Sequence, residues 1–303
     1  MNRIIMTGVT SIVGMALIEE CIKHGTEIYV IVRPDSSRKK QLHEYAHVIE
    51  CDLSRLGTID IESLPKFDVF YHFGWGNTAK RTRNDPMLQA VNIEYSIQAV
   101  RLAAKLKCRK FIGAGSQAEY GIHKDAKTGP TSIAEPIVAY GISKLAAGKL
   151  CRIEAINAGM DYAWVRIFSL YGKYEDDGTM IQTTLPKLQR NEHCPLTLGT
   201  QNWDFLYSED AGRAFYMIGE AKEPRDAIYC LGSGQARSIR SYVEEMKEAL
   251  GSTSELGFGE VPYDNGVPPS MCADIETLTN DTGWRPEVSF RDGILKGVSR
   301  SVK

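Results

Sequence analysis

The segment YGISK, residues 140–144, places a tyrosine and a lysine, Tyr140 and Lys144, four positions apart. Apolar residues recur at helical spacing from 139 to 158, so we expect a helix that carries both side chains on one face. A neighbouring ammonium favours the phenolate and lowers the pKa of a tyrosine from its usual value of about 10. Such a tyrosine can exchange a proton with a substrate oxygen, so the pair predicts general acid–base chemistry.

A second pair with the same spacing, Tyr120 and Lys124, shows that spacing alone does not select the catalytic tyrosine. This pair lies between a strand-like run and a loop that contains Gly121, Gly129 and Pro130, where no helix is expected. We therefore interpret Tyr120 as an anchor for the loop and Tyr140 as the acid–base residue.

The composition is that of an ordinary globular protein and argues against several classes of partner. The 303 residues are 43% hydrophobic and 24% charged, and 36 Lys and Arg against 38 Asp and Glu leave a net charge of -2. This balance predicts neither a nucleic-acid groove nor a patch for anionic membranes. No apolar run approaches the roughly 18 residues that span a bilayer, and the chain enters a strand at once, without a signal segment.

The cysteines and histidines predict a reducing compartment and no metal site. Seven cysteines are scattered through apolar contexts, odd in number and without any CxxC spacing. This pattern is typical of reduced, buried thiols and predicts a cytoplasmic protein. The six histidines show no ligand spacing, so we expect no bound metal.

Apolar strands alternate with amphipathic helices through the first half of the chain. The expected strands are 3–7, 27–32, 46–51, 68–73, 110–115 and 162–168. Strands that are apolar throughout and separated by helices predict an α/β fold with a doubly wound parallel sheet, the Rossmann arrangement, covered on both faces.

Polar and glycine residues follow these strands at their carboxyl ends, where a doubly wound sheet binds its ligand. They are the loop GVTSIVG at 8–14, Arg33, Asp52, Gly74, Ser116 and Ser169. Within the loop, Gly8 permits a tight turn, Gly14 lets the helix pack on the strand, and Ser11 can cap the helix. The N–H groups of that helix N-terminus suit a pyrophosphate.

The alternation of strands and helices breaks after about Tyr171. Segment 204–221 is expected to form a strand and a helix that return to the main sheet, and 227–232 one more strand. The other C-terminal pieces predict a smaller α/β lid that binds the substrate. We divide the chain into a dinucleotide-binding Rossmann domain, 1–171 plus 203–234, and a substrate-binding lid, 172–202 plus 235–303.

Several segments, taken together and in their order, resemble the extended short-chain dehydrogenase/reductase family of nucleotide-sugar epimerases, dehydratases and ketoreductases. TGVTSIVG is similar to the family's TGxxGxxG, YGISK to its YxxxK, and Asn92 to a structural helix asparagine. The other matching segments are CDL at 51–53, HFGW at 72–75, GSQAEYG at 115–121, VRIFSLYG at 165–172 and WDFLYSEDAGRAF at 203–215. The resemblance covers essentially the whole chain.

The resemblance implies three catalytic residues. Tyr140 would be the general acid that protonates a carbonyl oxygen as hydride arrives, or the base in the reverse direction. Lys144 would tune Tyr140 and hold the nicotinamide ribose. Ser116 would donate a hydrogen bond to the same oxygen and position it.

The resemblance also implies a set of cofactor-binding residues. They are Gly8, Thr10, Ser11, Ile12, Gly14, Arg33, Asp52, Leu53, Phe73, Gly74, Trp75, Tyr140, Lys144 and Ile167. NAD-selective folds of this kind place Asp or Glu after the second strand, whereas Arg33 stands here, near Arg38, Lys39 and Lys40. A guanidinium pairs with a 2′-phosphate, so we expect NADP(H) to be preferred and NAD(H) to be possible, with Asp35 as the opposing residue.

The substrate side departs from the family pattern. Ser169 stands where the family usually has Asn, Trp203 where an Arg commonly grips the diphosphate, and CAD at 272–274 lacks another frequent Arg. Either other cations hold the diphosphate or the substrate is not a typical nucleoside-diphosphate sugar. The candidate substrate-binding residues are Ser116, Gln117, Ser169, Lys187, Trp203 and Arg237.

Three functions are compatible with these residues. The first is NAD(P)H-dependent reduction of a keto group on a nucleotide-linked deoxysugar, which the expected NADP(H) favours. The second is an epimerase with retained NAD, and the third a non-catalytic dinucleotide sensor, which the tyrosine–lysine pair disfavours. Dehydration is disfavoured because Gln117 and Ala118 stand where dehydratases carry Asp and Glu. The resemblance further implies a homodimer through helices 87–107 and 139–158.

Overall fold

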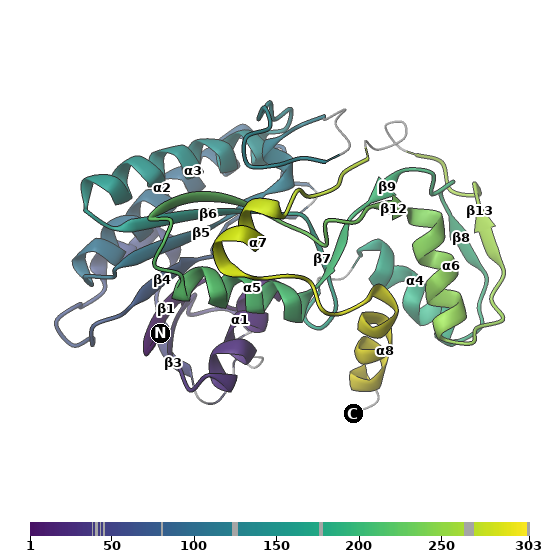
Figure 1. Cartoon of the computed structure of the whole chain (residues 1–303), viewed down its shortest axis with the longest axis horizontal. Helices are drawn as coiled ribbons and strands as arrows, with labels where there is room; N and C mark the ends of the chain where they lie inside the picture. Colours follow the sequence, from purple (N-terminus) through teal and green to yellow (C-terminus); the bar gives the residue numbers. More distant parts are fainter. Residues whose placement is uncertain are drawn as a thin grey trace.

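Seven parallel strands form the central sheet of the protein (Figure 1). In spatial order they are β11 (Asp226–Leu231), β6 (Asp161–Ile167), β5 (Lys110–Ser116), β4 (Val69–His72), β1 (Arg3–Thr7), β2 (Glu27–Val32) and β3 (Ala46–Glu50). All six pairings between them are parallel. The order reverses between β1 and β4, which confirms the predicted doubly wound sheet and places the ligand crevice at this point.

Burial explains why these residues form strands. Every residue of β4 and β5 is buried, as expected for central strands covered on both faces, whereas β3 at the edge is mostly exposed. Two helices cover each face, and Figure 1 shows one pair on either side of the sheet. They are α1 (Ile12–Lys23) with α5 (Ser208–Glu220), and α2 (Pro86–Lys105) with α3 (Ala139–Asn157).

The structure, a computed structural model, describes residues 1–37, 39, 42, 44, 46–79, 81–122, 127–175, 178–263 and 270–301, with side chains as far as 297. Three residues named above, Arg38, Lys40 and Lys124, lie outside the described residues. In the described part, no helix is long and apolar enough to cross a membrane.

One prediction about the sheet is wrong. The strand within 204–221, β10 (Phe205–Tyr207), does not join the main sheet but pairs with β7 (Ser169–Tyr171) in a separate two-stranded sheet. After β6 the chain leaves the main sheet, and β7 runs toward the C-terminal part. Only α5 of this segment returns to the main sheet, where it packs against α1.

The C-terminal elements form a second, smaller core beside the sheet, on the right of Figure 1. They are α4 (Met180–Gln189), β8 (Cys194–Leu196), β9 (Asn202–Trp203), β12 (Arg237–Ser238), α6 (Ile239–Ala249), β13 (Leu256–Phe258) and α8 (Phe290–Ser301). Strand β8 pairs with β13 and β9 with β12. We refer to this group as the lid, and its division from the Rossmann part stays a proposal.

A short helix that the sequence did not predict, α7 (Glu276–Thr282), returns the chain from the lid to the main sheet before α8 joins the lid again. Leu278 and Trp284 are fully buried in the core under α1 and α5. This segment therefore packs with the sheet, although it lies within the range assigned to the lid.

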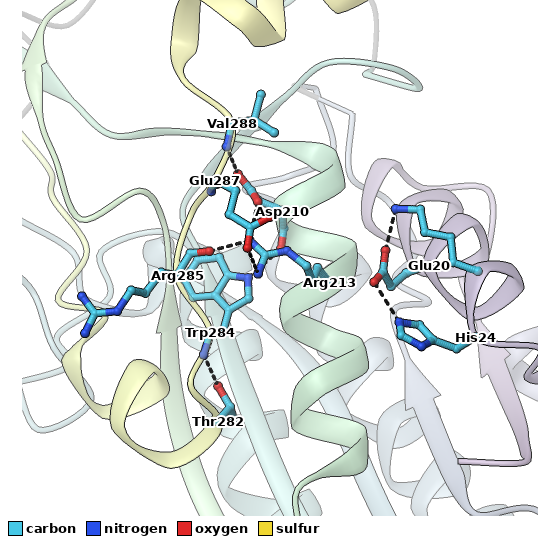
Figure 2. A network of polar contacts seen from close by, with 10 residues as sticks. Glu20, His24, Asp210, Arg213, Thr282, Trp284, Arg285, Glu287 and Val288 are labelled. Atoms are coloured by element: carbon cyan, nitrogen blue, oxygen red, sulfur yellow. Dashed lines mark hydrogen bonds and ion pairs between the residues drawn. The ribbon is translucent and has the colours of Figure 1, made fainter.

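Asp210 on α5 forms hydrogen bonds with the segment that follows α7 (Figure 2). Its carboxylate accepts hydrogen bonds from the backbone N–H groups of Glu287 and Val288, at 3.0 and 2.9 Å, and from Arg213 at 2.7 Å. Its backbone carbonyl accepts one from the Trp284 indole at 3.0 Å. A buried carboxylate is stable only with such partners, so this motif residue joins the lid segment to α5.

Candidate active site

Ser116, Tyr140 and Lys144 come together at the carboxyl end of β5. Ser116 is the last residue of β5 and caps a short 3₁₀ turn, where its Oγ accepts the N–H of Ala118 at 3.2 Å. Tyr140 and Lys144 lie in the first turns of α3, and a hydrogen bond joins the Tyr140 and Ser116 side chains. Two hydroxyl groups therefore meet where one carbonyl oxygen could contact both.

The structure does not show the expected lowering of the Tyr140 pKa by Lys144, which stays a prediction. Burial raises the pKa of Tyr140, and the influences that lower it are the charge of Arg83 and the hydrogen bond with Ser116. The Lys144 Nζ lies 5.9 Å from the centre of the Tyr140 ring. It is directed elsewhere, because it donates a hydrogen bond to the Ala114 carbonyl at 2.6 Å.

Lys144 is enclosed by aromatic rings. Its Nζ lies 3.9 Å from the centre of the Trp75 ring, and the side chain is almost fully buried. Burial lowers the pKa of this lysine to about 7, while the carboxylate of Glu119 acts in the opposite direction. A lysine poised near neutrality can gain or lose its proton as a partner approaches.

Glu119 forms a buried ion pair beneath Ser116. One carboxylate oxygen accepts the Ser116 backbone N–H at 2.8 Å and the Trp164 indole at 3.0 Å, and the other accepts Arg166 Nε at 2.8 Å. This network holds the turn that presents the Ser116 hydroxyl. It also explains why a carboxylate is present here although Glu119 is one position too late for dehydratase chemistry.

Tyr120 is a loop anchor, as predicted. Its hydroxyl donates to the Gly129 carbonyl at 2.7 Å and accepts from Arg166 at 2.8 Å, and the side chain is buried. Burial raises its pKa far above the usual value. It therefore has no access to a substrate, which supports Tyr140 as the acid–base residue.

The glycine loop has the geometry of a dinucleotide cradle. Gly8 has a φ of 68°, and a Cβ on it would lie 2.4 Å from the backbone nitrogen of Gly74. Ser11 caps α1, as predicted, because its Oγ accepts the Gly14 N–H at 3.2 Å. A Cβ on Gly14 would lie 2.5 Å from the Val9 carbonyl. The bare backbone and the helix N-terminus thus fit a pyrophosphate.

A chain of hydrogen bonds fixes the strand end beside this loop. The Gly74 N–H donates to the Thr7 hydroxyl at 3.2 Å, which donates to His72 Nδ1 at 2.8 Å. His72 Nε2 then donates to Ser96 at 3.1 Å, since the Ser96 hydroxyl donates to the Asn92 carbonyl at 2.8 Å. Burial lowers the pKa of this histidine to about 3, so the neutral ring completes the chain.

The remaining cofactor candidates occupy different positions along the same edge. The Leu53 side chain contacts Gly74, and Ile167 pairs with Ser116 in the sheet. Phe73 is a core residue, since its ring packs edge-on against Phe215, and only its backbone lies beside Gly8. Thr10 and Ile12 are partly exposed at the loop.

Arg33 and Asp52 lie close together at the ends of β2 and β3. Arg33 is exposed, and its charge contributes to lowering the pKa of Asp52, although hydrogen bonds from Ser54 contribute more. Asp52 caps the following turn by accepting the Ser54 N–H at 2.9 Å. The guanidinium is therefore available at the strand end where the adenine ribose is expected.

The substrate candidates lie in three places. Ser169, Trp203 and Arg237 come together, because the Trp203 indole donates to Ser169 Oγ at 2.6 Å and Trp203 pairs with Arg237 across β9 and β12. Gln117 is partly buried beside Ser116. The Arg237 guanidinium forms an ion pair with Glu245 and lies 4.1 Å from the centre of the Tyr242 ring.

Lys187 belongs to a separate pocket of about 370 Å³ within the lid. The pocket lies between α4, β8 and β13, and its walls include Leu196, Phe258 and Tyr263. Tyr263 is fixed there, because its hydroxyl donates to Gln201 at 2.7 Å. In the part of the chain that the structure describes, no cluster of side chains could hold a metal ion.

Sequence reasoning missed Arg83. This residue lies in the loop between β4 and α2, and its guanidinium carbon is 4.1 Å from the centre of the Tyr140 ring. It is separated from Tyr140 by 57 positions of chain, and nothing in its polar surroundings indicates a role. Only the folded arrangement of the two segments reveals it.

Most of the chain matches a known protein family. A family model described as the NAD dependent epimerase/dehydratase family matches residues 4–232. The chain belongs to this family. The sequence resemblance to extended short-chain dehydrogenases is thereby confirmed, and the matched range contains the glycine loop and all three residues at the end of β5.

Several relatives are similar to this chain over nearly their whole length. A protein named putative UDP-glucose 4-epimerase from Methanocaldococcus jannaschii is 22% identical, and CDP-abequose synthase from Salmonella muenchen 24%, each over 98% of this chain and 97% of the relative. The UDP-glucose 4-epimerase of Thermotoga maritima, solved with UDP-glucose, has a TM-score of 0.86 at 21% identity, covering 99% of this chain and all of that one. MoeE5 with UDP-glucose and NAD has a TM-score of 0.82 at 20% identity, with both chains fully covered.

Proposed function

We propose that this protein reduces a keto group on a nucleotide-linked deoxysugar with a reduced nicotinamide cofactor. The observation that carries the proposal is the meeting of the Ser116 and Tyr140 hydroxyls beside Lys144 at the ligand edge of the sheet. Two neighbouring hydroxyl groups can both donate hydrogen bonds to a carbonyl oxygen that becomes an alkoxide. The family membership supports the same chemistry.

In this reaction the residues of the chain position the carbonyl oxygen and supply its proton. The Gly8–Gly14 loop, Arg33 and Lys144 would hold the reduced nicotinamide cofactor, which would supply hydride to the carbonyl carbon. The Ser116 hydroxyl donates a hydrogen bond to the carbonyl oxygen and fixes its direction. The Tyr140 hydroxyl transfers its proton to that oxygen, and the resulting phenolate is protonated again from solvent. In the reverse direction Tyr140 removes the proton.

The lid pocket is the proposed place of the nucleotide. UDP-glucose and UDP-glucuronic acid are among the nucleotide sugars named for solved relatives of this fold. The pocket of about 370 Å³ offers Phe258 and Tyr263 as aromatic walls and Lys187 as a cation. We propose that Lys187 takes the place of the arginine that Trp203 replaces, while Trp203 and Ser169 face the sugar.

Cofactor selection is expected to depend on Arg33. The Arg33→Ala variant should lose about tenfold or more in NADPH affinity, because a charge-assisted hydrogen bond to the 2′-phosphate disappears, and should keep its NADH affinity. Fluorescence titrations with both nucleotides measure this. Lys39→Ala is the matched control, since Lys39 already pairs with Glu50 at 2.6 Å. A wild type that prefers NADH, or an unchanged NADPH affinity in Arg33→Ala, would contradict NADP(H) selection.

Epimerisation with a retained cofactor is the second candidate, because several solved relatives are named as epimerases and some contain NAD. It needs the same Ser116, Tyr140 and Lys144. The two reactions differ in their use of the cofactor. A purified protein that carries tightly bound NAD and interconverts two sugars without consuming NADPH would replace the reductase proposal with this one.

We also propose that the protein is a homodimer. Helices α2 and α3 pack side by side, and apolar side chains on both are exposed, among them Met87 at 77%, Ile142 at 53% and Ile153 at 54%. Exposed apolar residues on adjacent helices favour association with a second copy. Light scattering should give about twice the chain mass of 33.7 kDa, and Ile142→Glu with Ile153→Glu should give the single mass. A wild type that is monomeric at micromolar concentration excludes the dimer.

A further inference from the structure

The loop between β4 and α2 is hydrogen-bonded to the start of α3. The Asn84 side chain accepts the Ala139 N–H at 2.9 Å, directly before Tyr140. Asp85 caps α2 by accepting the Met87 N–H at 2.9 Å. Arg83 therefore directly precedes two residues whose side chains are anchored by hydrogen bonds, and this fixes the end of the loop beside α3.

This loop presents the guanidinium of Arg83 to the face of the Tyr140 ring, 4.1 Å from its centre. The edge of the Trp75 ring meets the same tyrosine at 5.9 Å and an interplanar angle of 79°. Arg83 is exposed, and among the described residues no carboxylate lies within ion-pair distance of it. Tyr140 thus lies between the Trp75 ring and a cation that has no acidic partner among the residues the structure describes.

The Lys144 ammonium contacts partners other than the Tyr140 ring. It donates to the Ala114 carbonyl and faces the Trp75 ring at 3.9 Å, against 5.9 Å for the Tyr140 ring. Arg83 is closer to the tyrosine ring than Lys144 is. A cation over an aromatic face is attracted by the ring electrons, and more strongly when the ring carries the negative charge of a phenolate.

We propose that Arg83 is a positioning residue of the acid–base step, whose guanidinium holds the Tyr140 ring and stabilises the phenolate formed when that tyrosine gives up its proton. The proposal rests on the acid–base role of Tyr140 in the proposed function. It gives Arg83 an electrostatic role in addition to that of Lys144, which would also hold the cofactor ribose.

The charges around Tyr140 agree with this assignment. Burial raises its pKa, and the charge of Arg83 lowers it, followed by the hydrogen bond from Ser116. The Glu119 carboxylate, beneath the 3₁₀ turn, raises it. Together with Lys144 one turn further along α3, these are the charged groups that face Tyr140 from the described elements packed against it.

The test is a titration of Tyr140 that needs no substrate. Tyrosine labelled with ¹³C at Cζ is followed by NMR over the alkaline range in which the protein stays folded, and the Tyr140 signal is assigned by its loss in Tyr140→Phe. Arg83→Met should lower the ionisation constant of Tyr140 about 2- to 5-fold, and Arg83→Lys by less, because a cation remains. Arg81→Met, a neighbouring exposed arginine, is the matched control and should leave the constant unchanged.

Turnover provides the second readout. With a keto-sugar substrate and NADPH, Arg83→Met should lower kcat, shift the alkaline limb of the pH profile upward and leave KM within about twofold. An equal Tyr140 ionisation constant in wild type and Arg83→Met overturns the proposal, as does a change in KM alone, which would make Arg83 a substrate contact. A shifted constant in a protein that turns over no sugar would support the Arg83 assignment while removing the proposed function.

Discussion

Tyr140→Phe is expected to lower turnover by roughly 10²- to 10⁴-fold, because it removes the proton that the carbonyl oxygen receives. The ring and its contacts with Arg83 and Trp75 remain, so the affinity for NADPH and the melting temperature should stay close to those of the wild type. Steady-state oxidation of NADPH with a keto-sugar, nucleotide titration and thermal unfolding measure the three quantities.

Tyr120→Phe is the matched control for this experiment. The Tyr120 hydroxyl has buried partners, so its loss should lower the free energy of unfolding by about 1–3 kcal/mol and leave turnover in the folded protein nearly unchanged. If the two substitutions damage turnover equally while both proteins stay folded, the assignment of Tyr140 is wrong.

Lys144→Met is expected to damage catalysis and cofactor binding together, each by at least about 10-fold, because the ammonium that would hold the ribose is lost. The free energy of unfolding, in contrast, should increase in this variant. Burial lowers the pKa of Lys144 from 10.5 to about 7 in the folded chain. At neutral pH this buried, partly charged lysine therefore destabilises the folded state. Methionine removes this destabilisation and fills a similar volume.

The pH dependence of stability tests the same lysine. Between about pH 7 and 10.5 the unfolded chain binds a proton that the folded chain has released, so raising the pH increases the free energy of unfolding of the wild type. This contribution is at most about 1.4 kcal/mol per pH unit and is absent in Lys144→Met. Urea unfolding of both proteins at several pH values from about 7 to 9 measures it. Parallel pH dependences in the two proteins would show that Lys144 is not desolvated.

The features that the sequence predicted share a physical reason. A parallel sheet requires strands buried on both faces, so β1, β4 and β5 are readable as apolar runs, and their carboxyl ends bring the residues that follow them to one edge. The same rule predicts that Ser116 and Gly8 lie at one edge of the sheet. The helical spacing of Tyr140 and Lys144 added the acid–base pair.

The features that were not predicted depend on contacts between distant segments. The direction of the Lys144 ammonium is decided by the Ala114 carbonyl and the Trp75 ring, neither of which the YGISK spacing encodes. Arg83 reaches Tyr140 only because Asn84 fastens its loop to α3. Side-chain direction and loop docking are set by packing, and a single sequence without related sequences carries little signal for them.

The arrangement of the candidate substrate-binding residues could be predicted from the sequence only in part, for a similar reason. The grouping of Ser169 with Trp203 follows from a parallel pairing of β7 with β10 that could not be read from three-residue strands. Short strands lack a distinctive pattern, and the prediction accordingly placed β10 in the wrong sheet. Lys187 lies in the lid pocket for a related reason, since its place depends on how α4 packs against β8.

The most direct test of the central claim follows the hydride itself. The protein is incubated with NADPH that carries deuterium at the reactive carbon of the nicotinamide, together with keto-deoxyhexoses linked to uridine, cytidine or deoxythymidine diphosphate. Mass spectrometry then measures deuterium in the sugar. We expect one deuteron in the product for each NADPH oxidised with at least one of these sugars, and none with Tyr140→Phe on the same timescale. Sugars that are interconverted without deuterium or NADPH consumption, or left unchanged by a folded, cofactor-bound protein, would contradict the account.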